Sequence, residues 1–175
     1  FGVEGFYKQL WNRVVAGRTS NDPAYTNDGL GRIYGLEVSA SVAANCTIAT
    51  SALTFGAYDP VDINSASPLV GSGAVTVRCT LGSSVVVELD EGANGNVGSA
   101  PDAPLRRLVD GGYFLAYDLF SNEARTAVWG VGNDVDVPVI GTGTDTQLVV
   151  YGAVQAGQNV PAGAYTDTVV ATVTF

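Results

Sequence analysis

Apolar and polar residues alternate along much of the chain, most clearly from Ile33 to Cys46. Polar residues separate the apolar positions of this stretch, which are Leu36, Val38, Ala40 and Val42. Residues two apart on a β-strand share a face, so the pattern predicts a strand over 33–42 with one apolar face. How the chain works depends on whether that face fills the core of its own domain or that of a neighbouring subunit.

Short segments with the same two-residue period follow. The predicted strands are 52–58, 74–81, 85–89, 113–120, 127–131, 135–139, 147–154 and 165–175. The turn signal Gly82-Ser83 predicts a hairpin between the second and third of these, and the nearly continuous apolar run 147–154 predicts a central strand. Short strands separated by turns are typical of a two-sheet sandwich, so we expect one all-β domain.

The first 32 residues have a different composition. Phe6, Leu10 and Val14 recur at four-residue spacing, which predicts a short helix over 4–16. A helix of this length needs a surface to dock on, the alternative being a disordered tail. We expect docking through Phe6, Leu10, Trp11 and Val14. Residues 17–32 have the composition of a loop, so the expected organisation is an arm (1–32), a strand segment (33–44) and a sandwich (45–175).

Composition narrows the possible functions. Hydrophobic residues make up 46% of the chain and charged residues 14%, and the absence of histidine excludes His-based triads and His metal sites. The net charge of −9 combines +1 over residues 1–36 (four basic, three acidic) with −10 beyond them (four basic, fourteen acidic). An acidic body argues against nucleic-acid binding, and no apolar run is long enough to insert into a membrane.

The chain has two cysteines, Cys46 and Cys79. They predict a single disulfide formed in an oxidising compartment, the alternative being two buried free thiols. Closing a loop of this length would stabilise the fold by about 3–4 kcal/mol, mainly through the unfolded state.

Three acidic pairs have side chains that could support metal binding or catalysis. Asp90-Glu91 and the pair Asp134 and Asp136 have the oxygen ligands that calcium prefers, but neither forms a complete calcium loop. Asp59 with Asp62 matches a glycosidase pair only by composition. All of these fit solvated turn acids better, so we expect no enzyme activity, no metal and no cofactor. Trp129 is expected to pack in or at the edge of the sandwich.

Short motifs recur through the second part of the chain. They are V-A-A-N-C-T-I at 42–48, L-T-F-G-x-Y at 53–58, V-x-V-x-C-T at 75–80, L-x-Y-x-L-F at 115–120, W-G at 129–130, V-Y-G at 150–152, Gln158, G-x-Y-x-D-T-V at 163–169 and V-T-F at 173–175. In this order they resemble the spore coat protein U domain family, which includes the major pilins of archaic chaperone–usher pili. The resemblance spans about residues 36–175 and gives no counterpart for residues 1–32.

The resemblance implies an incomplete immunoglobulin-like sandwich that a donor strand from a neighbouring subunit completes. By position, the donor residues would be Leu36, Val38, Ala40 and Val42. Cys46 and Cys79 would form the family's disulfide, and the strand ending at Phe175 would border the groove. The implied partners are other copies of the chain, a periplasmic chaperone and an outer-membrane usher, and the implied location is a secreted pilus at the cell surface.

The expected function is therefore a non-enzymatic subunit of an extracellular fibre, serving adhesion or biofilm formation. One alternative is a monomeric coat or secreted protein of the same family that uses 33–42 as its own strand. Another is a carbohydrate-binding adhesin that uses the loops 57–73 or 91–104.

Overall fold

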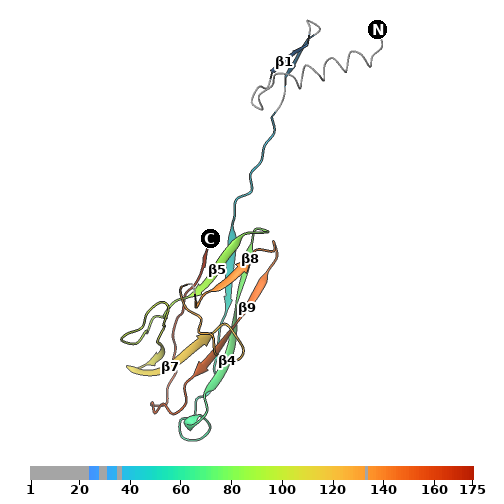
Figure 1. Ribbon diagram of the computed structural model, residues 1–175. Helices are drawn as coiled ribbons and strands as arrows, with labels where there is room; N and C mark the ends of the chain where they lie inside the picture. Colours follow the sequence, from blue (N-terminus) through green and yellow to red (C-terminus); the bar gives the residue numbers. More distant parts are fainter. Residues whose placement is uncertain (1–23, 28–30, 35–36, 133) are drawn as a thin grey trace. The chain divides into compact units, whose positions relative to one another are not determined.

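The computed structural model describes residues 24–27, 31–34, 37–132 and 134–175, and almost all of its regular elements are strands (Figure 1). The chain divides into one unit that ends at Val42 and a second, the body, that runs from Ala43 to Phe175. Among the described residues, no helix is long and apolar enough to cross a membrane.

The body consists of two antiparallel sheets. One has the order β3-β4-β9-β7-β6 and the other the order β10-β5-β8. The elements are β3 (Cys46–Ser51), η1 (Ile63–Ser65), β4 (Leu69–Cys79), β5 (Ser84–Leu89), β6 (Arg106–Asp110), β7 (Tyr113–Phe120), β8 (Val137–Ile140), β9 (Thr146–Val154) and β10 (Ala171–Thr174). The prediction of an all-β two-sheet sandwich is confirmed, as is the central position of 147–154, because β9 lies between β4 and β7.

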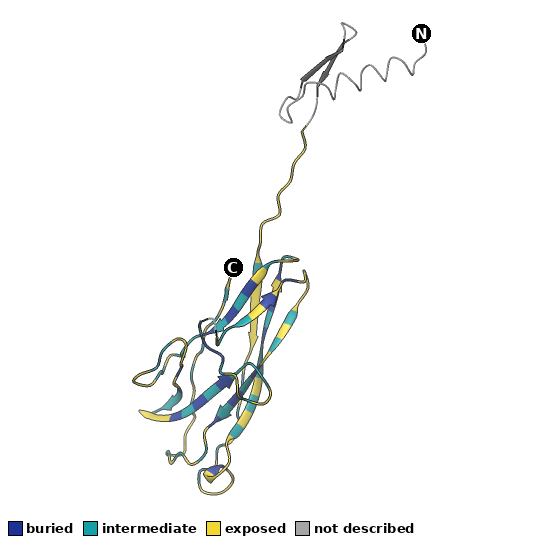
Figure 2. Cartoon of the chain, in the orientation of Figure 1, coloured by how far each residue is buried: buried dark blue, intermediate teal, exposed yellow. Residues whose placement is uncertain are grey.

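The core lies between the inward faces of the two sheets, where every second residue is buried (Figure 2). The five-stranded sheet contributes Val75, Val77, Cys79, Leu115, Tyr117, Leu119, Val150 and Val154, and the other contributes Val85, Val87, Leu89 and Val139. Trp129 is 1% exposed, so its predicted packing in the sandwich is confirmed.

The predicted hairpin across Gly82-Ser83 is wrong. β4 and β5 belong to different sheets, and the turn carries the chain from one sheet to the other. The Ser83 amide donates to the Thr80 carbonyl at 3.0 Å within this turn. Both strands keep one apolar face, but these faces pack across the core. Alternation alone does not distinguish strands that pair from strands that pack face to face.

Other boundaries differ from the prediction. The first strand of the body is β3, and the predicted strand 52–58 is not one. The predicted strand 127–131 contains only an isolated bridge between Phe120 and Val128. β6 was not predicted, because it begins with two arginines. Arg106 is buried and Arg107 half-buried, whereas an alternating strand is recognised by apolar residues at its buried positions.

In the first unit, β1 (Ala24–Asn27) pairs antiparallel with β2 (Gly31–Tyr34), from Ala24 opposite Tyr34 to Asn27 opposite Gly31. The prediction of a loop over 17–32 is therefore wrong for the residues in these two strands. It rested on the many Gly, Asn, Asp and Pro residues in this segment, which are typical of turns. Ile33 lies in β2, whereas residues 37–45 are exposed and belong to no strand (Figure 2). Over its described part 37–42, the predicted strand 33–42 is thus not formed, since a strand needs a partner edge and no described strand pairs with 37–45.

Some predictions fall on residues outside the described ranges. They are the helix over 4–16, its proposed docking residues Phe6, Leu10, Trp11 and Val14, and the first proposed donor residue, Leu36.

Candidate functional site

One side of the sandwich is bordered by two backbone edges that have no strand partner in the described part of the chain. β10 pairs only with β5, from Ala171 opposite Leu89 to Thr174 opposite Val86. β3 pairs only with β4, and no backbone–backbone hydrogen bond among the described residues involves 52–58, the segment that follows it. We call 52–58 the wall and 165–174 the lip, and the space between them the groove.

The groove contains two hollows that share part of their lining. The large hollow, of about 640 Å³, lies between residues 53–60 and 160–167. The small hollow, of about 310 Å³, lies between residues 50–55 and 167–171. Both are lined by Leu53, Phe55, Leu108 and Asp167, so they form one continuous groove.

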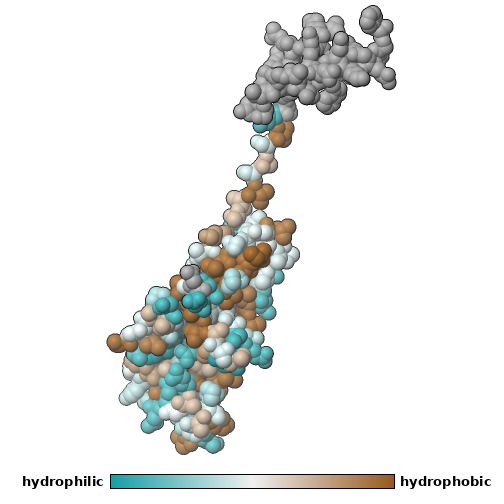
Figure 3. All heavy atoms as spheres, in the orientation of Figure 1, coloured by the Kyte–Doolittle hydropathy of each residue, from teal (hydrophilic) through white to brown (hydrophobic). Residues whose placement is uncertain are grey.

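The lining of the groove is largely apolar and incompletely covered. On the lip, Tyr165, Val169, Ala171 and Val173 pack against the core but remain half-buried. The residues between them are exposed, which gives the two-residue period of a strand facing inward. Phe175 at the end of the chain is 66% exposed, and hydrophobic residues reach the surface at several places along the body (Figure 3).

The wall packs against glycines of the five-stranded sheet. A Cβ at Gly152 in β9 would lie 2.7 Å from Phe55 Cε1 and 2.9 Å from Leu53 Cδ1. A Cβ at Gly73 in β4 would lie 3.1 Å from Leu53 Cβ. The missing side chains let the wall cross close to the sheet. Phe55 also packs edge-on against Tyr117, with ring centroids 5.9 Å apart.

A polar contact lies where the two hollows meet. The Tyr117 hydroxyl donates to Asp167 Oδ2 at 2.7 Å, and Asn94 Nδ2 donates to Asp167 Oδ1 at 2.9 Å. Burial raises the pKa of Tyr117, and the hydrogen bond to Asp167 raises it further, so this hydroxyl remains a donor at neutral pH. Both carboxylate oxygens are thus paired within an otherwise apolar groove.

A buried arginine ties loops to the core. Arg106 is 1% exposed, and its Nη2 donates to the carbonyls of Leu89 and Trp129 at 2.9 and 2.8 Å. Its Nε donates to the Asp90 carbonyl at 2.8 Å. Burial lowers the pKa of the Arg106 guanidinium, and nearby Tyr117 and Asp90 counter part of that effect. These three hydrogen bonds offset part of the free-energy cost of burying the guanidinium, and they also give the three carbonyls a donor.

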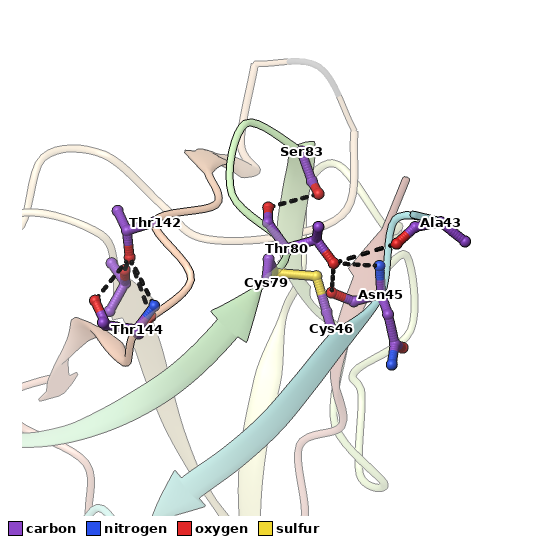
Figure 4. The surroundings of a disulfide bond; sticks show 9 residues. Ala43, Asn45, Cys46, Cys79, Thr80, Ser83, Thr142 and Thr144 are labelled. Atoms are coloured by element: carbon purple, nitrogen blue, oxygen red, sulfur yellow. Dashed lines mark hydrogen bonds between the residues drawn. A yellow bond between two sulfur atoms is a disulfide. The ribbon is translucent and has the colours of Figure 1, made fainter. Parts of the chain in front are cut away.

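The predicted disulfide between Cys46 and Cys79 is present, at directly opposite positions of β3 and β4 (Figure 4). Next to it, the Thr80 amide donates to the Asn45 carbonyl at 2.9 Å, and the Asn45 amide donates to Thr80 Oγ1 at 3.1 Å. These bonds fix the point at which residues 43–45 enter the body.

The proposed donor residues are unpartnered where they are described. Val38 and Val42 are 82% and 84% exposed, and Ala40 is exposed as well. Sequence reasoning had placed only the C-terminal strand beside the groove and had missed the wall and floor. The motif L-T-F-G-x-Y at 53–58 was a signal for the wall, because its apolar residues alternate although the segment is not a strand.

The acidic pairs form no metal site. Among the described residues, no group of three or more Cys, Asp or Glu side chains comes together in a way that could hold a metal ion. Asp59 accepts hydrogen bonds from the amides of Val61 and Asp62, which is the role of a turn residue.

The fold and the groove define a class of protein: an immunoglobulin-like sandwich with an apolar groove between two unpaired edges. Residues 33–172 match the Spore Coat Protein U domain, and the chain belongs to that family. A curated relative, Protein U of Myxococcus xanthus, is 42% identical over 148 residues, which cover 80% of this chain and 83% of that protein.

A solved structure supports the same fold. The chain resembles the CsuC–CsuE chaperone–tip adhesion subunit pre-assembly complex from archaic chaperone-usher Csu pili of Acinetobacter baumannii, with a TM-score of 0.52 and 23% identity. The match covers 82% of this chain and 41% of that chain, so this chain spans less than half of it. The family resemblance read from the sequence is confirmed. The chain is therefore a structural protein of the Spore Coat Protein U family and not an enzyme, and its likeness to the Csu complex supports the fold.

Proposed function

We propose that the chain is a structural subunit of an extracellular fibre whose copies join by donor-strand exchange. In this joint, residues 36–42 of one copy lie in the groove of the next, between its wall and its lip. The groove itself carries the proposal. It has apolar, half-buried side chains, and on each side a backbone edge that no strand of the described part of the chain pairs with, which is the environment that an added strand satisfies.

The proposed donor segment has matching properties. Its apolar side chains alternate with polar ones, so a strand formed by 36–42 would place Leu36, Val38, Ala40 and Val42 on one face. Burying each of the three larger side chains would contribute about 1.5–3 kcal/mol. Backbone hydrogen bonds to both edges would add about 1 kcal/mol each. Such a joint would dissociate very slowly.

An open apolar groove and an exposed apolar segment are an aggregation hazard before assembly. The Csu structure is described as a chaperone–subunit complex that precedes assembly. By analogy we propose that a periplasmic chaperone occupies the groove of this chain and that an outer-membrane usher exchanges it for the next subunit. We propose adhesion or biofilm formation at the cell surface as the purpose of the fibre.

The rival within the same family is a monomer whose own residues 33–42 fill its groove. The two differ in size on a denaturing gel run with mild detergent and without boiling. A ladder of bands that resists dissociation supports the fibre, and a single monomer band from the native chain would contradict it.

The matched test places one carboxylate on either face of the donor segment. Val38→Asp should abolish the ladder, because a charge in the apolar groove costs several kcal/mol. Ser39→Asp, one residue away on the opposite face, should leave the ladder intact. If Val38→Asp still gives ladders and normal fibres in micrographs, the donor assignment is wrong.

A further inference from the structure

The motif G-x-Y-x-D-T-V at 163–169 contains one acidic residue, Asp167, in the middle of the apolar groove. The lip carries this carboxylate between Thr166, which bridges Val109 of β6, and β10, and its partner Tyr117 lies in β7, so their hydrogen bond fastens the lip to the floor of the groove. On its other side, the Tyr117 ring packs edge-on against Phe55 of the wall. Asp167, Tyr117 and Phe55 therefore form a continuous strut from lip to wall.

Before Ala171 the lip forms an isolated bridge and no strand, so side-chain contacts such as that of Asp167 add to its few backbone ties. Its other ties are to β6 and to the loop that follows β5. Thr166 and Val109 each donate to the carbonyl of the other, and the Ala93 amide donates to the Thr168 carbonyl. The Asp90 amide donates to the Val170 carbonyl, and the Val170 amide donates to Asp90 Oδ1. The Asp167 side chain adds a polar tie to the groove floor, through the Tyr117 hydroxyl.

Neighbouring residues keep the carboxylate of Asp167 in place. Asn94 holds its second oxygen, and Asn94 lies in a loop that Arg107 fixes by donating to the Asn94 and Gly95 carbonyls at 3.1 and 3.0 Å. Gly92 lies directly against the carboxylate, so a Cβ at this position would collide with Asp167 Oδ2.

An empty apolar groove gains free energy by closing, because its walls bury one another. Closing this groove would break the hydrogen bonds of a half-buried carboxylate, and leaving such a group unpaired is costly. We propose that Asp167 is a positioning residue that holds the lip and the wall apart, so that the groove admits a strand from another copy and does not close on itself. This inference rests on the proposed donor-strand exchange.

The strut should matter while the groove is empty and lose importance once a strand pairs with both edges. Loss of Asp167 should therefore slow strand uptake and leave strand release unchanged. A residue that only stabilises the fold would speed release as well, or lower the folded fraction without changing the rate of uptake by the folded chains.

The experiment uses the full chain carrying Val38→Asp, which disables its own donor segment, and a fluorescent synthetic peptide of residues 33–45. Adding Asp167→Ala should lower the association rate constant about tenfold and keep the dissociation rate constant within about twofold. Asp145→Ala, which removes an exposed carboxylate elsewhere, should change neither. Equal association rates with and without Asp167 would overturn the inference.

A second pair of variants tests the strut without altering Asp167. Gly92→Ala pushes against the carboxylate, whereas Gly98→Ala, at a similar positive φ in the same loop, meets nothing within 4 Å. Only the first should slow uptake, and equal effects would overturn the inference. Exchanging the two partners, Asn94→Asp with Asp167→Asn, should restore at least half of the lost rate. Failure of the peptide to bind the chain with Asp167 intact would overturn the proposed function, and this inference with it.

Discussion

The two sides of the body differ in how the same alternating pattern is covered. On the closed side, Val87 is 0% and Trp129 is 1% exposed, and the indole Nε1 donates to the Val87 carbonyl at 2.9 Å. On the open side, Leu53 and Val169 alternate just as regularly but stay half-buried beside edges that have no partner. The comparison shows that alternation marks the face turned toward a core, whereas coverage of that face depends on which strands are present.

The largest effect is expected on the closed side. Arg106→Met removes the donors of three carbonyls, two of them in buried hydrogen bonds, so we expect a loss of about 3–5 kcal/mol in the free energy of unfolding. Val169→Ala on the open side should cost only about 1 kcal/mol, because water already reaches that surface. Urea denaturation measures both. Equal losses in the free energy of unfolding would mean that the apolar faces of the two sides are buried to the same extent.

Removing the disulfide should be the next largest effect. Cys46→Ala with Cys79→Ala frees the pairing between β3 and β4 at the end where the chain enters the body, and should cost about 3–4 kcal/mol. The same denaturation measurement, made beside the oxidised wild-type chain, checks this. A loss below about 1 kcal/mol would show that the hydrogen bonds between Asn45 and Thr80 hold this end without the disulfide.

A smaller effect is expected where the wall packs against Gly152. Gly152→Ala places a methyl group against Phe55 and Leu53, which should cost about 1–3 kcal/mol and shift the wall, since the wall has no strand pairing to resist it. Slower uptake of the donor peptide should accompany the loss of stability. Unchanged uptake would show that the wall is not part of the accepting site.

The smallest effect concerns the arm. Deleting residues 1–30 should preserve the joints between subunits but give fibres that bend and melt more easily, because Phe6, Leu10, Trp11 and Val14 are predicted to pack on another subunit. Persistence length in micrographs and the melting temperature of the fibres are the measurements. If truncated and full-length fibres match in both, the arm adds nothing to the fibre.

The sequence predicted the sandwich and the disulfide because both follow from local signals: period-two alternation, and two cysteines with no other partner. It did not predict which strands pair, since the faces of β4 and β5 look the same whether the strands form a hairpin or pack across a core. It missed β6, where the guanidinium of Arg106 is buried by binding carbonyls distant in sequence.

The candidate site was only half predictable. The apolar alternation of 36–42 is visible in the sequence, whereas the groove is formed by contacts between segments far apart, such as Phe55 with Tyr117 and Tyr117 with Asp167. The role of Asp167 could not be read from its motif, because it depends on the hydroxyl of Tyr117, which lies 50 residues away in the sequence.

Pairing between copies is tested most directly by cysteine cross-linking. One variant carries Ala40→Cys on the apolar face of the donor segment, and the other carries Val169→Cys on the lip. When the two are mixed during assembly and gently oxidised, we expect a covalent dimer that contains one chain of each. Ser39→Cys, on the opposite face, should give none with the same partner. No cross-link in the mixture, together with an efficient intramolecular bond in a dilute chain carrying both cysteines, would contradict strand exchange.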